Sequence, residues 1–92
     1  MDLKTLEYLE SRAKQGRKIA DRIDELRGKK EKLLIIRKVA FLDNYNDRIF
    51  NLDPSYQGEN DHHKRIIDEI KAALKNAIEN EIARLEQELA EL

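Results

Sequence analysis

The chain has 92 residues, of which 40% are apolar and 40% charged, with three Gly, one Pro and no Cys. A chain this short supports one domain at most, and it buries only about 60–65% of its unfolded surface. The composition excludes a disulfide framework and a thiolate metal site, no apolar run is long enough to span a membrane, and the opening residues lack a signal-peptide pattern. We therefore expect an unprocessed, cytoplasmic protein that does not enter the membrane.

The charge is divided unequally between the two halves of the chain, although the net charge is only −1. Residues 1–40 carry 12 basic and 7 acidic side chains, or +5, whereas residues 41–92 carry 6 basic and 12 acidic ones, or −6. Opposite charges of similar size predict that the halves lie against each other in the folded protein.

The first predicted element is a long helix over about residues 2–50, with Asp2 as its N-cap. Gly16 and Gly28 are the two positions at which it would bend or break. Because an isolated Gly costs a helix only about 1 kcal/mol relative to Ala, we expect an unbroken or gently bent helix at Gly28. The apolar positions recur at helical spacing, and they are Leu3, Leu6, Leu9, Ala13, Ile19, Ile23, Leu26 and Leu33.

The second part of this helix contains two unusual segments. The four adjacent apolar residues Leu33–Ile36 cover more than one helix face, which predicts contact with more than one neighbour. The segment Asp43–Asp47 has the oxygen-rich alternation of a calcium loop, but Arg48 and Pro54 replace the required Gly and Glu. We interpret it as the polar face of the helix near its end.

A loop over about residues 51–60, which contains Pro54 and Gly58, separates this helix from a last helix over about residues 61–92. The apolar positions of the last helix advance by three or four residues at each step, about 3.6 on average, which predicts a weakly supercoiled helix. These positions are Ile67, Ile70, Leu74, Ile78, Ile82, Leu85, Leu89 and Leu92.

The sequence thus predicts an all-α fold, a single domain built as a long antiparallel, coiled-coil-like helical hairpin. A short connection sets residues whose numbers sum to about 110 opposite each other, and the apolar and charge patterns agree on this pairing. Residues 1–15 then lack a partner. They can fold back as a short third helix or dock on a second copy, and because a two-helix core is thin we expect a homodimer that forms a helical bundle.

Four of the five aromatic residues cluster near the predicted loop: Phe41, Tyr45, Phe50 and Tyr56. One interpretation is a small apolar plug that closes the end of the hairpin. The other is an exposed patch in which Tyr45, Phe50 and Tyr56 anchor a protein partner. We predict a non-catalytic protein–protein interaction module, such as a small adaptor, an assembly factor or an inhibitor of a larger protein.

Nucleic-acid binding is the first alternative, through basic residues of the N-terminal helix. Neither interleaved aromatic residues nor a short recognition helix accompanies them, so such binding would be tolerant of sequence and sensitive to salt. The residues concerned are Arg12, Arg17, Lys18, Lys29 and Lys30.

A small helical enzyme is the second alternative, although the chain has no nucleophile–base pair and no Gly-rich phosphate loop. Arg22-Ile23-Asp24, followed by Leu33-Leu34 and Arg37, resembles the first helix of the helical chorismate mutases over less than a quarter of the chain. The resemblance implies a helical enzyme but assigns no catalytic residue.

Metal binding has one candidate motif, the Glu-x-x-His spacing of Glu59 and His62, with His63 adjacent. Adjacent residues of a helix point about 100° apart, and no further carboxylate ligand can be named. We therefore predict neither a metal nor a cofactor.

Overall fold

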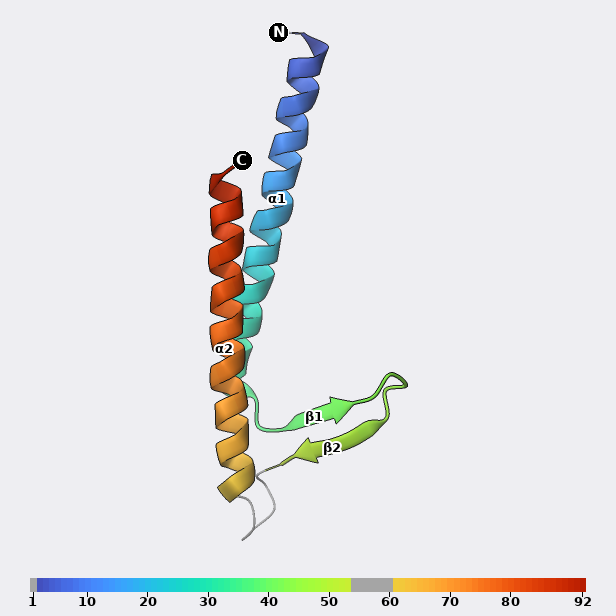
Figure 1. Ribbon diagram of the computed structural model, residues 1–92, viewed down its shortest axis with the longest axis vertical. Helices are drawn as coiled ribbons and strands as arrows, with labels where there is room; N and C mark the ends of the chain where they lie inside the picture. Colours follow the sequence, from blue (N-terminus) through green and yellow to red (C-terminus); the bar gives the residue numbers. More distant parts are fainter. Residues whose placement is uncertain (1, 54–60) are drawn as a thin grey trace. The chain divides into compact units, whose positions relative to one another are not determined.

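The structure, a computed structural model, describes residues 2–53 and 61–92, without the side chain of Asp61 (Figure 1). Two helices of 30 residues each make up most of it, which confirms the predicted helical character. A two-stranded antiparallel sheet, which was not predicted, lies between them in the sequence. The elements are α1 (Leu3–Lys32), the 3-10 turn η1 (Leu33–Ile35), β1 (Val39–Leu42), β2 (Arg48–Leu52) and α2 (Asp61–Ala90).

Helix α1 begins after Asp2, whose carboxylate Oδ1 accepts a hydrogen bond from the backbone N–H of Thr5 at 2.7 Å. This bond caps the helix as predicted, and it lowers the pKa of the Asp2 carboxyl below its usual 3.8. The helix continues without a break through Gly16 and Gly28.

The chain forms two compact units. The helical unit comprises α1 up to Glu31 together with Ala77–Leu92, and the arm unit comprises Lys32–Asn76. Helix α2 therefore contributes its first half to the arm unit and its second half to the helical unit.

In the helical unit, α1 and the second half of α2 run in opposite directions. Ion pairs of 2.9 Å join Arg27 to Glu86 and Lys30 to Glu79, and these residue numbers sum to 113 and 109. Both sums lie close to the register of about 110 that the apolar and charge patterns predict. The buried apolar side chains of this unit are Ile19, Ile23, Ile78, Ile82 and Leu85.

The arm unit corrects the prediction of a helix that extends to about residue 50. Helix α1 ends at Lys32, and β1 and β2 pair as a hairpin, with Val39 opposite Leu52 and Phe41 opposite Phe50. Both strands are rich in β-branched, aromatic and Leu residues, which pack well on a pleated surface. A helix here would also have to contain Asp43–Asp47, which contains Asp and Asn, residues that favour turns.

The segment Asp43–Asp47 is the turn of this hairpin, and not the polar face of a helix. Asp43 accepts backbone hydrogen bonds through Oδ1 from the N–H groups of Tyr45 (2.8 Å) and Asp47 (3.0 Å). Asn46 has a φ of 64°, a left-handed conformation that Asn adopts more readily than most residues. The three-residue loop Asn44–Asn46, closed by a backbone hydrogen bond from Asp43 N–H to Asp47 O, ends in this left-handed residue, which is a common way to close a hairpin.

Among the described residues of the arm unit, three apolar side chains are buried: Leu33, Leu52 and Ile67. The run Leu33–Ile36 does not make the extensive contacts that its composition predicts. Leu33 is buried, but Leu34 and Ile35 are 85% and 79% exposed. The core of this unit is therefore confined to the base of the hairpin.

Candidate partner-binding site

The β1–β2 hairpin and its turn, residues 39–52, form an arm whose large apolar side chains are exposed. Tyr45 in the turn is 83% exposed, Ile49 is 64% and Phe50 is 53%. Phe41 and Leu42 in β1 are also exposed. The arm thus presents several large apolar side chains to solvent within one short stretch of chain.

Both faces of the arm are apolar. The rings of Phe41 and Phe50 stack on one face, with their centroids 4.5 Å apart and their planes 24° from parallel. Leu42 follows Phe41 along β1, so by strand alternation it points to the opposite face. The register shifts here, with Arg48 opposite Leu42, so Ile49 is the extra residue of a β-bulge. No third strand pairs with the hairpin among the described residues, and an isolated two-stranded hairpin is only marginally stable in water.

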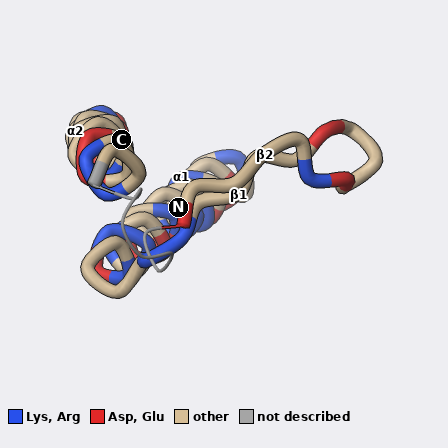
Figure 2. Tube along the Cα trace, turned by 90° about the horizontal axis from the view of Figure 1, so that it is seen from below, with Lys and Arg blue, Asp and Glu red and all other residues tan. Residues whose placement is uncertain are grey.

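The charges of the arm are concentrated at its turn, as the charge-coloured trace shows (Figure 2). Asp43 and Asp47 lie in the turn, and Arg48 begins β2. The strands themselves carry uncharged side chains elsewhere. An apolar surface with a charged margin is typical of protein interfaces, in which a polar rim surrounds apolar anchors.

The structure therefore brings two of the three predicted anchor residues, Tyr45 and Phe50, onto the arm. The third, Tyr56, lies outside the described residues. The plug interpretation does not hold for Phe41, Tyr45 and Phe50, because all three are exposed and none is enclosed by its surroundings.

Asp53 fixes the base of the arm. It directly follows β2, it is only 9% exposed, and its carboxylate pairs with the ammonium group of Lys38 at 3.2 Å. His63 of α2 places Nδ1 3.3 Å from both the backbone N and the backbone O of Asp53. The ring accepts from the N–H in one tautomer and donates to the C=O in the other. Either bond ties the end of β2 to α2.

The candidate metal motif consists of Glu59 and His62, with His63 adjacent. Nδ1 of His63 is already hydrogen-bonded to the backbone of Asp53. Glu59 lies outside the described residues. Within residues 2–53 and 61–92, no group of three or more His, Cys, Asp or Glu side chains could hold a metal ion.

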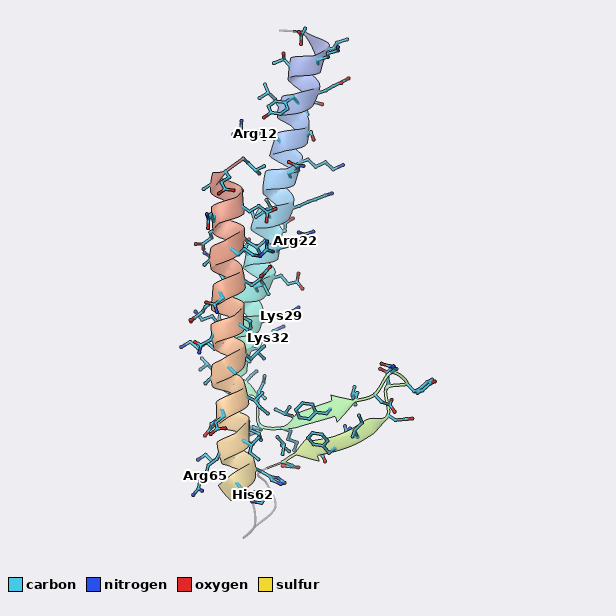
Figure 3. All side chains as sticks on the ribbon, in the orientation of Figure 1. Arg12, Arg22, Lys29, Lys32, His62 and Arg65 are labelled. Atoms are coloured by element: carbon cyan, nitrogen blue, oxygen red, sulfur yellow. The ribbon has the colours of Figure 1, made fainter. Side chains whose placement is uncertain are left out.

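The basic residues of the nucleic-acid alternative do not share one face of α1. Arg17 and Lys18 are adjacent and so point about 100° apart, and Arg12 is about 140° from Arg17. Lys29 pairs with Glu25 at 3.0 Å and Lys30 with Glu79 at 2.9 Å. Arg12 and Lys29 lie at well-separated levels of the helix (Figure 3).

The residues that resemble the chorismate mutases do not lie on a single helix. Arg22 belongs to α1, whereas Leu33 and Leu34 form part of η1 and Arg37 lies between η1 and β1. The structure therefore does not reproduce the helical spacing on which the resemblance depends.

Comparison of the chain with protein-family models, with curated proteins and with solved structures found no match. Among the described residues, neither helix combines the length and the apolar character that crossing a membrane requires.

Proposed function

We propose that this chain is a non-catalytic protein–protein interaction module that binds a larger protein through the β1–β2 arm. It acts as an adaptor, an assembly factor or an inhibitor. One observation carries the proposal: a two-stranded hairpin exposes Tyr45, Ile49 and Phe50 and has apolar side chains on both of its faces. Exposed apolar patches of this kind are typical of sites at which proteins bind one another.

The arm presents large apolar and aromatic side chains, which contribute most of the binding energy at protein interfaces. Fully burying a side chain such as Phe contributes about 1.5–3 kcal/mol, and aromatic residues are enriched among the few residues that dominate interface energies. Covering the hairpin with a partner would supply the additional layer that an isolated two-stranded sheet lacks. Tyr45 and Phe50 are the anchors we propose, with Tyr56 as the third anchor suggested by the sequence.

The proposal is tested by affinity capture from a lysate of the source cells. Wild-type chain should retain a partner that the double variant Tyr45→Ala/Phe50→Ala loses, while the helical circular dichroism stays unchanged. Tyr8→Ala is the matched control, because Tyr8 is a 62% exposed aromatic residue on α1, far from the arm in the sequence. Capture that survives the double variant, or that depends equally on Tyr8, would contradict the role of the arm.

We also propose that the chain is a homodimer in which the helices associate as a coiled-coil-like bundle. Leu3, Leu6 and Leu9 of α1 are 75%, 44% and 43% exposed, although they continue the apolar stripe of the helix. A second copy that covers this stripe would bury it. Gel filtration with light scattering should give twice the 10.8 kDa mass of one chain, and a monomer at all concentrations would contradict the dimer.

Sequence-tolerant nucleic-acid binding is the second candidate function. In its favour, Arg12, Arg17 and Lys18 are exposed and form no ion pair with any residue that the structure describes. A mobility-shift assay at low salt, with single-stranded and duplex DNA and RNA, should show retardation that disappears as salt rises. No retardation at low salt would eliminate it. No comparable observation favours a small helical enzyme. For the interaction module we propose a cytoplasmic location, which cell fractionation tests.

A further inference from the structure

A cavity of about 530 Å³ lies beside the base of the arm, between the segments that enter and leave the hairpin and the first half of α2. Its volume is within the range of about 300–1,000 Å³ that is usual for ligand pockets. Ile36 and Ile67 supply apolar surface, and Ile67 is only 3% exposed. The cavity belongs entirely to the arm unit.

The cavity is lined mainly by positive charge. Four cations, Arg37, Lys38, Lys64 and Lys71, face two carboxylates, Asp53 and Asp68, which leaves a net charge of +2. An excess of positive charge in a recess attracts a ligand of opposite sign.

Among the described residues, two of these cations have partners and two do not. Lys38 pairs with Asp53, and Lys71 donates a hydrogen bond of 3.1 Å to the backbone O of Ile36. Arg37 and Lys64 form no ion pair or hydrogen bond with any residue in the described part of the chain. An arriving anion would therefore find one guanidinium and one ammonium group uncommitted.

The cavity adjoins the base of the arm, although none of its lining residues belongs to β1 or β2. Val39 and Leu52 form the first residue pair of the hairpin, next to the cavity residues Lys38 and Asp53. Phe41 and Phe50 form the pair two positions further along, so their side chains point to the same face. Two residues of a strand span about 7 Å. A bound peptide in an extended conformation therefore needs only a few residues to reach from the stacked rings to the cavity.

We propose that the arm binds an acidic–apolar segment of its partner protein. One large apolar side chain of that segment packs on the Phe41–Phe50 stack, and a carboxylate two to four residues away enters the cavity and pairs with Arg37 and Lys64. The segment lies in an extended conformation along the arm, where a strand edge that pairs with no described residue can also supply backbone hydrogen bonds. This inference rests on the proposed function, because it names the chemistry of the partner that the arm binds.

The test selects peptides from a random 12-residue library displayed on phage, with the full chain as the target. Synthetic copies of the selected peptides are then measured by fluorescence anisotropy. We expect an Asp or Glu two to four residues from a bulky apolar residue, and an affinity that falls as salt increases. Replacing the selected acid with its amide should weaken binding about tenfold, which is a usual effect for a charge-assisted hydrogen bond.

Variants of the chain identify the cavity as the recognition site. Arg37→Glu and Lys64→Glu should each weaken binding at least tenfold, and Lys64→Gln, which only removes the charge, should weaken it less. Lys75→Glu is the matched control: it makes the same charge change on an exposed residue of the arm unit that does not line the cavity. Circular dichroism and thermal unfolding confirm that each variant folds.

Two failures can be told apart. Peptides whose binding depends on Phe50 but ignores Arg37→Glu and Lys64→Glu would overturn the acidic partner and leave the proposed function intact. A library that yields no peptide whose binding depends on Phe50 would contradict the proposed function itself.

Discussion

The helical unit and the arm unit differ in how far they bury large apolar side chains. In the helical unit, Ile19, Ile23 and Leu85 are 5%, 4% and 2% exposed, because complementary stripes on two helices cover each other. In the arm unit, Ile49 and Phe50 are 64% and 53% exposed, because a two-stranded hairpin with no further layer among the described residues leaves both faces open. Internal packing therefore stabilises the first unit, whereas the apolar surface of the second is available to a partner.

The largest expected effect is the difference between Leu85→Ala and Phe50→Ala in the free energy of unfolding that each variant loses. Leu85 is the most completely buried large side chain among the described residues, and truncating such a residue usually costs about 2–5 kcal/mol. Phe50→Ala, on the exposed arm, should change the free energy of unfolding by about 1 kcal/mol or less, mainly through the lost stacking on Phe41. Urea unfolding followed by circular dichroism measures both values. Equal losses would show that the two units do not differ in this way.

A smaller effect is expected at Asn46, whose positive φ shapes the turn of the arm. Asn46→Val should destabilise the hairpin by about 1–2 kcal/mol, because a left-handed conformation forces Cβ close to the following carbonyl oxygen. Asn46→Gly is the control and should preserve the turn. Amide exchange of Phe41 and Phe50 reports the change, while exchange at Ile19 and Ile23 should be unaffected. Faster exchange in both units would mean that they unfold together.

Smaller still is the contribution of the ion pairs of the helical unit. Arg27–Glu86 and Lys30–Glu79 join side chains that are about 40–60% exposed, so solvent screens their attraction. A double-mutant cycle on Arg27 and Glu86 should give a coupling energy of about 1 kcal/mol or less, decreasing with salt. A coupling several times larger would mean that charge, and not the apolar stripe, holds the helices together.

The smallest effect concerns the N-terminal cap of α1. The hydrogen bond from the N–H of Thr5 lowers the pKa of Asp2 below its usual 3.8. The Asp2 carboxylate therefore binds a proton less tightly in the folded protein than in the unfolded chain. The stabilisation of α1 by the Asp2 carboxylate is complete above about pH 3.8. It is lost as the pH falls through the lower pKa that Asp2 has in the folded state. Exchange of the Thr5 amide should therefore show a protection that declines in acid.

Asp2→Asn provides the control for this pH dependence. Asn also caps helices but does not titrate in this range, so the variant should show a protection of Thr5 that is independent of pH. The same acid dependence in both proteins would assign the effect to another group.

The helices could be predicted because their signals are redundant. The steps of three and four from Ile67 to Leu92 and the division of charge both indicate one pairing, and the Arg27–Glu86 and Lys30–Glu79 ion pairs lie close to that register. Gly16 and Gly28 did not interrupt α1, since a single Gly costs a long helix little.

The hairpin could have been predicted but was not. Leu42, Tyr45 and Ile49 continue the helical period by coincidence, and a short apolar run fits a helix as well as a strand. The better signal was a cluster of Asp and Asn at residues 43–47, between two runs of β-branched, aromatic and Leu residues, which is typical of a hairpin with a short loop.

The site was predictable only in part. Tyr45 and Phe50 could be identified because aromatic residues are few and clustered. The cavity could not, because Arg37 and Lys64 are 27 positions apart and line one cavity only once β1 and β2 have reversed the chain. Their role depends on tertiary structure, which composition and periodicity do not encode directly.

Hydrogen exchange with and without a bound peptide tests the role of the arm most directly. With a selected peptide at saturation, amide exchange should slow in β1 and β2, residues 39–42 and 48–52, and remain unchanged in α1 from Ile19 to Glu31. Slower exchange in α1 and in the second half of α2, with none in the arm, would contradict the proposal that the hairpin binds the partner.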